Sequence, residues 1–192
     1  MARPKEFESE TALKKAIEIF SEHGYEGTST DALVRAMGIG RQSLYDTFGD
    51  KRRLYLEALQ RYTADSISNQ LQALNLVSSP MKGLEAMFDL AVTLAIAGPG
   101  PKCLGISAVC EFGRSDPEVT IITDMAGRTM LSGLERRISE AKAAGEIGKG
   151  LDTQTAAQFI MATLAGIKIA ARSGAAPQIL RGIARMAMRS LK

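Results

Sequence analysis

The sequence predicts an all-α protein of about nine helices, and three observations support this fold class. Apolar residues recur at the i, i+3, i+4, i+7 spacing of amphipathic helices along almost the whole chain of 192 residues. No segment alternates convincingly between apolar and polar residues, so we expect no strand. Short breaks rich in Gly, Pro and Ser separate the apolar segments, as turns between helices do.

The elements follow in chain order. We expect Ser9 to cap the first helix and Gly24 to end it, and Thr28 with Asp31 has the capping-box spacing of a second helix start. The Gly-Pro-Gly-Pro run at residues 98–101 is the clearest break. Helices are expected over residues 9–24, 28–37, 41–47, 51–76, 81–97, 103–112, 117–144 and 152–173, and from 177 onward.

Composition excludes several classes of protein. The net charge is +3, and residues 1–62 balance ten Lys and Arg against ten Asp and Glu, so only their arrangement could create a basic surface. Neither a secretory leader nor an apolar run long enough for a membrane is visible. Two cysteines are too few for a disulfide framework. We therefore expect a cytoplasmic protein without membrane contact.

Residues 28–47 read as a helix-turn-helix, because two short helices are joined by a three-residue Gly-Ile-Gly turn. The second helix is too short to be stable alone, so Leu44 and Phe48 should pack against its neighbours. The N-terminal end of such a helix enters the DNA major groove, where Arg suits guanine and Gln suits adenine. The base-reading candidates are Arg41, Gln42 and Ser43.

Three cations, Lys51 to Arg53, open the next helix. A helix N-terminus carries partial positive charge, so each cation there is disfavoured by roughly 0.3–1 kcal/mol. A DNA phosphate beside this helix start would attract both the dipole and Lys51. A solvated basic turn explains the same residues without DNA.

The segment FSEHGYEGTSTDALVRAMGIGRQSLYDTFGDKRRLYLEAL resembles the N-terminal DNA-binding domain of the TetR family of bacterial transcriptional regulators. The resemblance covers residues 8–60 closely, and the remainder matches in length and helical character. The residues that carry it are Phe20, Gly24, Tyr25, Thr28, Ser29, Leu33, Gly38, Ile39, Leu44, Tyr45, Phe48, Lys51 and Leu54.

The resemblance implies a homodimer that reads a palindromic DNA operator and is released by a small ligand bound in the C-terminal body. It also implies an all-α fold with a three-helix DNA-binding domain at residues 1–50 and a helical ligand-binding and dimerisation domain at 51–192. Gly40 stands where the family often has Ser, and Thr47 where His is common, so those operator contacts should differ. By position, the implied phosphate contacts are Thr28, Ser29, Thr30, Tyr45 and Lys51.

The last two helices have the small and apolar residues that close helix packing requires. Paired with a second copy, they would form a four-helix bundle, as the family implies. The alternative is that they cover the core of their own chain, and the resemblance favours the dimer interface. The candidate interface residues are Phe159, Ile160, Leu164, Ile167, Ile179, Ile183 and Ala187.

The middle of the chain is rich in Met, a residue that fills irregular space and adapts to varied ligands. A pocket for an apolar or amphipathic effector and an ordinary core both fit this composition. The candidate lining residues are Met81, Met87, Phe88, Cys103, Cys110, Phe112, Met125 and Met130.

The two cysteines suggest a weaker hypothesis. Cys103 lies beside Lys102 near the start of a short helix, which favours a reactive thiolate, whereas Cys110 should be buried in an apolar segment. Ordinary packing also explains both. With His23 isolated, no metal ligand set appears, and no catalytic constellation or cofactor-binding loop appears either.

These observations favour a ligand-responsive transcriptional regulator, most simply a repressor, that is not an enzyme and has no cofactor or metal. An alternative is a DNA-bound adaptor that recruits a protein partner without a small ligand. An all-helical enzyme or carrier is disfavoured, because Tyr45 and Lys51 are both present and no catalytic set is.

Overall fold

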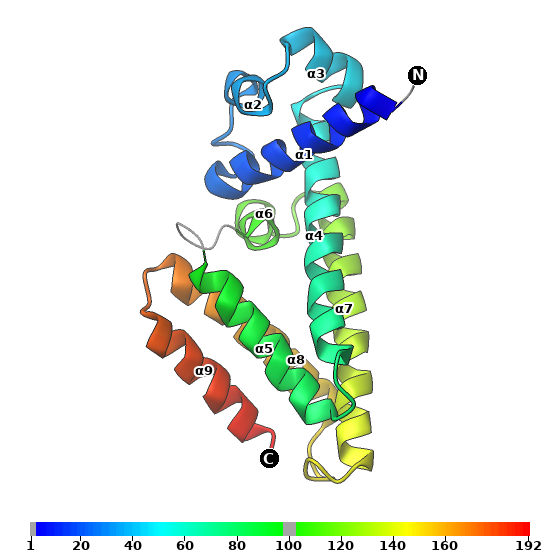
Figure 1. The fold of residues 1–192 in the computed structure, drawn as a ribbon, viewed down its shortest axis with the longest axis vertical. Coiled ribbons are helices and arrows are strands. Elements are labelled where there is room, and N and C mark those ends of the chain that lie inside the picture. Colours follow the sequence, from blue (N-terminus) through cyan, green and yellow to red (C-terminus); the bar gives the residue numbers. More distant parts are fainter. Residues whose placement is uncertain (1–2, 98–102) are drawn as a thin grey trace. The chain divides into compact units, whose positions relative to one another are not determined.

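The computed structural model describes residues 3–97 and 103–192 of the chain, and this part forms nine α-helices and no strand. The predicted all-α class is therefore confirmed. The predicted Gly-Pro break at 98–101 and Lys102 lie outside the described residues. The helices are α1 (Arg3–His23), α2 (Thr30–Met37), α3 (Arg41–Phe48), α4 (Lys51–Asn75), α5 (Pro80–Ile96), α6 (Leu104–Phe112), α7 (Pro117–Ala143), α8 (Thr153–Arg172) and α9 (Pro177–Ser190) (Figure 1).

Two predicted helix starts are wrong. α1 begins at Arg3 rather than at Ser9, because Pro4 is compatible with a first turn and the following Glu-rich stretch has good helix propensity. α2 begins at Thr30, and its N-cap is Ser29, whose hydroxyl accepts a hydrogen bond from the Ala32 backbone N–H at 3.1 Å. Thr28 makes no capping box, because its buried hydroxyl instead donates to the Gly24 carbonyl at 2.6 Å.

The described residues pack as two compact units. The first contains the residues up to 65 together with 103–125, and the second contains 66–97 together with 126–192. α4 and α7 each contribute residues to both units. The division into 1–50 and 51–192 that the sequence suggested concerns function, and it stays a prediction.

The core of the first unit holds the short α3 in place. Leu44 is fully buried and Phe48 is 6% exposed, which confirms the support predicted for this helix. They share one apolar cluster with Leu33 of α2, Phe20 of α1 and Leu54 of α4. α3 is therefore stabilised by tertiary packing rather than by its own eight residues.

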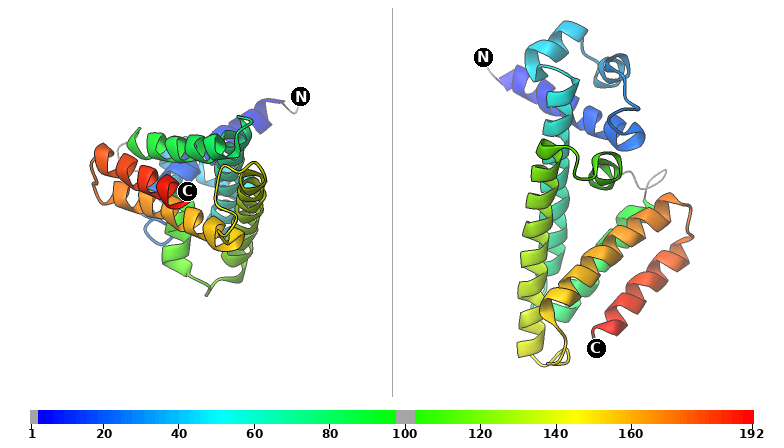
Figure 2. Two further views of the ribbon diagram at one scale, coloured as in Figure 1. Left: turned by 90° about the horizontal axis from the view of Figure 1, so that it is seen from below. Right: turned by 180° about the vertical axis from the view of Figure 1, so that it is seen from behind.

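In the second unit, α5, α8 and α9 lie side by side (Figure 2) and pack on parts of α4 and α7. Arg137 of α7 is buried, and its guanidinium donates to the carbonyls of Val77 and Ser79 at 2.8 and 3.3 Å. Glu146 accepts from the Ser79 hydroxyl and the Met81 backbone N–H at 3.1 and 2.8 Å. These bonds fix the connection between α4 and α5.

Within residues 3–97 and 103–192, no helix combines the length and the hydropathy needed to cross a membrane.

Candidate nucleic-acid interface

α2 and α3 form the predicted helix-turn-helix (Figure 1). Gly38 ends α2, and its backbone N–H donates to the Val34 carbonyl at 3.1 Å. Gly40 is the N-cap of α3 and offers no side-chain hydrogen bond, as expected where a Ser is replaced by Gly. The backbone N–H groups of the first turn of α3 are therefore left to water or to an external acceptor.

The three base-reading candidates all lie exposed at the N-terminal end of α3. Arg41 donates to Asp31 of α2 at 2.8 Å, and Gln42 donates to Asp46 one turn along at 2.8 Å. Ser43 is exposed beside them. An exposed ion pair is worth at most about 1 kcal/mol, so DNA could readily displace the Arg41–Asp31 pair.

The phosphate candidates divide into two groups. Ser29 and Tyr45 are exposed and Thr30 is half-buried, so these side chains can reach an external phosphate. Thr28 is only 1% exposed, and its hydroxyl is engaged by the Gly24 carbonyl. Thr28 is therefore removed from the predicted contacts, because burial and this hydrogen bond leave it no free donor.

The three cations at the start of α4 have three different surroundings. Lys51 places its Nζ 4.1 Å from the centre of the Tyr25 ring. Arg52 donates to Asp116 at 2.7 Å and to Glu118 at 3.1 Å, at the start of α7. The side chain of Arg53 lies against Gly49.

The Arg52–Asp116 pair changes the acid–base behaviour of both groups. The hydrogen bond from Arg52 lowers the pKa of Asp116, and the bond to Asp116 raises the pKa of Arg52. Asp116 lies 64 residues along the chain from Arg52. From the sequence, Arg52 was expected to belong to a basic cluster. In the structure its charge is instead neutralised by the carboxylates of Asp116 and Glu118.

Glu111 of α6 contacts the α1–α2 turn, and no sequence pattern predicted this. Its carboxylate accepts hydrogen bonds from the backbone N–H groups of Tyr25 and Glu26 at 2.8 and 2.7 Å, just beyond the end of α1. Next to it, the rings of Tyr25, Tyr55 and Phe112 pack with centroids 5.0 to 5.8 Å apart. A lone Glu on an apolar helix gives no sequence signal of this contact, which spans 86 residues.

Tyr55 lies fully buried in this aromatic cluster, and its hydroxyl has no hydrogen-bond partner among the described residues. Burial raises the pKa of the Tyr55 phenol above its usual value, and the nearby Glu111 carboxylate raises it further. The phenol therefore stays protonated and neutral at physiological pH.

The predicted effector-pocket residues are distributed over both units. In the second unit, Met81, Met87, Phe88 and Met130 are all less than 9% exposed and belong to its packed core. In the first unit, Cys103 is buried, Phe112 is half-buried in the aromatic cluster, and Cys110 and Met125 are exposed. A surface groove runs along α9 in the second unit, and of the eight residues only Phe88 lines it.

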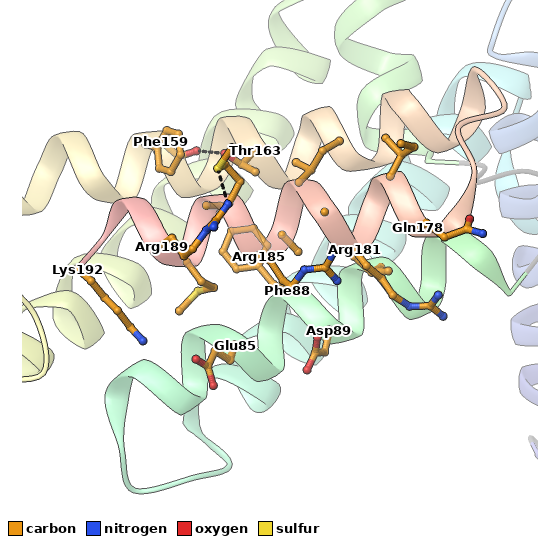
Figure 3. A pocket seen from close by; sticks show the side chains of 18 residues that line it. Glu85, Phe88, Asp89, Phe159, Thr163, Gln178, Arg181, Arg185, Arg189 and Lys192 are labelled. Carbon is orange, nitrogen blue, oxygen red and sulfur yellow. Dashed lines mark hydrogen bonds between the residues drawn. The ribbon is translucent and has the colours of Figure 1, made fainter.

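That groove in the second unit has a volume of about 1220 Å³ and runs along α9 between α5 and α8 (Figure 3). Apolar side chains from all three helices line it, and charged groups border it: Glu85 and Asp89 on α5, and Arg181, Arg185, Arg189 and Lys192 on or after α9. No sequence pattern indicated this groove, because its walls come from segments about 100 residues apart.

The candidate interface residues are split between core and surface. Ile160, Leu164, Ile167 and Ala187 are at most 4% exposed and serve the core of their own chain. Phe159 and Ile179 are 42% and 57% exposed, and Ile183 is half-buried. The sequence missed two further exposed apolar side chains on these helices, Ile169 and Met186.

The cysteines reverse the sequence expectation. Cys103 is 7% exposed and lies beside Tyr62, whereas Cys110 is exposed on α6. Burial, followed by the contact with Cys103, raises the pKa of the Tyr62 phenol. Within the described part of the chain, no group of three or more His, Cys, Asp and Glu side chains could hold a metal ion.

Two family models match the sequence. The model described as "Bacterial regulatory proteins, tetR family" matches residues 12–58. The model described as "Tetracyclin repressor-like, C-terminal domain" matches residues 80–187. Together they cover the helix-turn-helix and the helices from α5 to α9.

Individual relatives match over most of the chain. The HTH-type transcriptional regulator YezE of Bacillus subtilis (strain 168) is 32% identical over 163 residues, which are 83% of this chain and 84% of the relative. The HTH-type transcriptional repressor ComR of Escherichia coli (strain K12) is 26% identical over 189 residues, 97% of this chain and 90% of ComR. Among solved structures, a cysteine mutant of the TetR family regulator CifR, complexed with 26-base-pair operator DNA, superposes with a TM-score of 0.80 at 25% identity, covering 95% of this chain and 96% of that one.

Proposed function

The chain belongs to the tetR family of bacterial regulatory proteins, and from this premise we propose that it is a transcriptional repressor that binds a palindromic operator as a homodimer and is released by a small effector. The single observation that carries the DNA-binding part is the exposed N-terminal end of α3, which presents Arg41, Gln42 and Ser43 from a helix buried on its other face. It would act in the cytoplasm, where the bacterial chromosome lies.

In this proposal the side chains of α3 read bases, and the surrounding groups hold the DNA backbone. Arg41 would leave Asp31 to contact a guanine, and Gln42 would leave Asp46 to contact an adenine. Phosphates would be held by Ser29, Thr30, Tyr45 and Lys51. A symmetric dimer requires two half-sites whose centres lie about one helical turn, or a multiple of it, apart.

Dimerisation would use the surface of α8 and α9. Phe159 and Ile169 on α8, and Ile179 and Met186 on α9, are all at least 42% exposed. Large apolar side chains gathered on neighbouring helices mark an interaction surface more often than a solvated one. A second copy presenting the same surface would bury both in a two-fold interface.

The effector would be apolar or amphipathic, as the methionine-rich composition of residues 81–130 indicates. Residues 1–50 would then carry the DNA-binding function, and residues 51–192 the effector-binding and dimerisation functions.

Genome-wide mapping of bound DNA in the native host tests this proposal most directly, because the neighbouring genes would also indicate the class of effector. Palindromic sites should be enriched, and light scattering should give a dimer in solution and in the DNA complex. A monomer bound to a single asymmetric site would contradict the proposal. If no small-molecule extract dissociates the protein–DNA complex, and the complex captures a protein partner, the adaptor alternative would be favoured.

A further inference from the structure

We propose that Glu111 of α6 and Tyr25 act as positioning residues, which hold the Lys51 ammonium group in place for a DNA phosphate. This inference rests on the proposed function, in which Lys51 contacts the DNA backbone. It adds a residue far from the helix-turn-helix in sequence to the determinants of DNA affinity. Three contacts, all within the first compact unit, link Glu111 to Lys51.

The first contact fixes the turn between α1 and α2. The Glu111 carboxylate accepts the Tyr25 N–H at 2.8 Å and the Glu26 N–H at 2.7 Å, one with each oxygen. Hydrogen bonds to an ionised carboxylate are shorter and stronger than those between neutral groups. α6 thereby holds the backbone of the residue that carries the Tyr25 ring.

Gly24 makes this approach possible. Its φ of +71° lies in the left-handed region that favours glycine. A Cβ at this position would lie 2.8 Å from Glu111 Oε2, so any larger residue would push the carboxylate away. The turn and the carboxylate therefore fit each other only with glycine at this position.

The second contact orients the Tyr25 ring. Its centroid lies 5.0 Å from that of Tyr55 and 5.8 Å from that of Phe112, the residue that follows Glu111. Tyr55 in turn packs edge-on against Phe20 of α1, with centroids 5.0 Å apart. The ring is consequently held by its backbone and by aromatic neighbours on two sides.

The third contact places Lys51. Its Nζ lies 4.1 Å from the centroid of the Tyr25 ring, a distance at which the negative face of the ring attracts a cation. This attraction offsets the repulsion that the start of α4 exerts on a cation. A lysine held in this way also loses less side-chain freedom when it meets a phosphate.

Charge and positioning predict opposite results for one substitution. Glu111→Gln removes a negative charge, and by long-range electrostatics alone it should strengthen DNA binding. If Glu111 positions Lys51, the same change should weaken binding. Asp124→Asn is the matched control, since it removes a carboxylate of the same unit that accepts two hydrogen bonds from Arg114.

The experiment measures binding of the full-length protein to a fluorescently labelled duplex of arbitrary sequence over a range of salt concentrations. Such a duplex suffices because phosphate contacts do not depend on sequence. Glu111→Gln should lower the affinity about two- to fivefold, the range expected when one cation–π interaction is weakened. Asp124→Asn should leave the affinity unchanged or raise it. Tyr25→Leu should lower it similarly, and Tyr25→Phe, which keeps the ring, should restore it.

The decisive comparison repeats Glu111→Gln in a Lys51→Ala background. If Glu111 acts through Lys51, Glu111→Gln should change the affinity by less than about twofold in the Lys51→Ala background. A change of that size is no larger than the deviation usually seen between two substitutions that do not interact. An equal loss in both backgrounds would overturn the inference, as would a gain in affinity for Glu111→Gln alone. Thermal unfolding of each variant by circular dichroism verifies that the folded protein is compared. If the unmodified protein binds neither this duplex at low salt nor any genomic site, the proposed function itself fails, and this inference fails with it.

Discussion

Arg41 and Lys51 carry the same charge, yet their positions assign them different tasks. Arg41→Ala should cost about 1–3 kcal/mol on the operator and little on random DNA, because it removes a base contact. Lys51→Ala should weaken binding to every sequence alike and reduce the slope of log K against log salt by about one. Fluorescence anisotropy titrations at several salt concentrations measure both quantities. Equal losses for Arg41→Ala on both DNAs would reassign that residue to the backbone, and an unchanged slope would remove Lys51 from the contacts.

The exposed fractions of the two thiols lead to a prediction opposite to that from the sequence. Cys110 should react with an alkylating agent at nearly the rate of a free thiol, whereas Cys103, buried beside Tyr62, should react much more slowly. Mass spectrometry of timed alkylation reactions gives both rates. Equal labelling of the two would show that Cys103 is opened by local unfolding. Cys110→Ser isolates the slow site as a control.

Single-residue roles were predictable from the sequence where they depend on local pattern. The burial of Leu44 and Phe48 follows from helical periodicity, and the end of α1 at Gly24 follows from the preference of glycine for helix ends. The partners of Arg52 and Glu111 lie more than 60 residues away, and no spacing rule connects them. Contacts of this kind are fixed by tertiary packing alone.

Gly83 is a position where one added methyl group should be costly to α5. A Cβ there would overlap the Leu74 carbonyl oxygen and lie 2.9 Å from Nη2 of the buried Arg137. Gly83→Ala should therefore lower the free energy of unfolding by about 1–3 kcal/mol or more. Gly127→Ala in α7 is the control, because nothing lies within 4 Å of its Cβ position and alanine favours the helix. That change should stabilise by about 0.4–1 kcal/mol, and urea unfolding measures both.

The pair between Arg52 at the start of α4 and Asp116 before α7 should make stability depend on pH. The folded-state pKa of Asp116 is lowered, so the stabilising contribution is present above the unfolded value of about 3.9 and is lost as the pH falls through the folded value. Asp116→Asn keeps a capping side chain for α7 and removes only the charge. Its unfolding midpoint should be lower at neutral pH but fall less steeply in acid. If the unfolding midpoints of the two proteins fall in parallel as the pH is lowered, the pair contributes nothing to stability.

Element boundaries show the same division between local and distant causes. The existence and order of all the helices followed from apolar periodicity and from Gly and Pro breaks. The start of α2 was misplaced because two adjacent hydroxyl residues both suit an N-cap, and burial decides that Ser29 takes the role while Thr28 faces inward. Likewise, Ser9 resembles a cap but lies inside α1.

At the scale of the whole molecule, assembly should depend on the apolar surface of α8 and α9. Phe159→Glu combined with Met186→Glu should convert a dimer into a monomer, because each would place a charge in a desolvated interface. Leu94→Glu on α5 is the control, since Leu94 is 59% exposed but lies outside those helices. Multi-angle light scattering over a dilution series checks both. A dimer that survives the double substitution would place the interface elsewhere.

The sequence did not predict how the chain divides into two packing units. α4 and α7 each pass from one unit to the other within a continuous helix, at residues 65–66 and 125–126. Helical periodicity runs on unchanged through such a point, so no composition shift or linker marks it. The all-α class and the helix-turn-helix were predictable because both depend on local patterns, namely apolar periodicity and the glycines between helices.

The close approach of Glu111 to Gly24 restricts the order in which this chain can accumulate mutations. A side chain at residue 24 and a carboxylate at residue 111 compete for one space, and the left-handed backbone adds strain for any side chain there. A lineage that first loses the acid removes the steric conflict and leaves only the backbone strain of a side chain at 24, whereas the reverse order passes through an intermediate that carries both the strain and a displaced Glu111 carboxylate. The two positions should thus behave as one epistatic pair, with the tolerated residues at each depending on the history of the other.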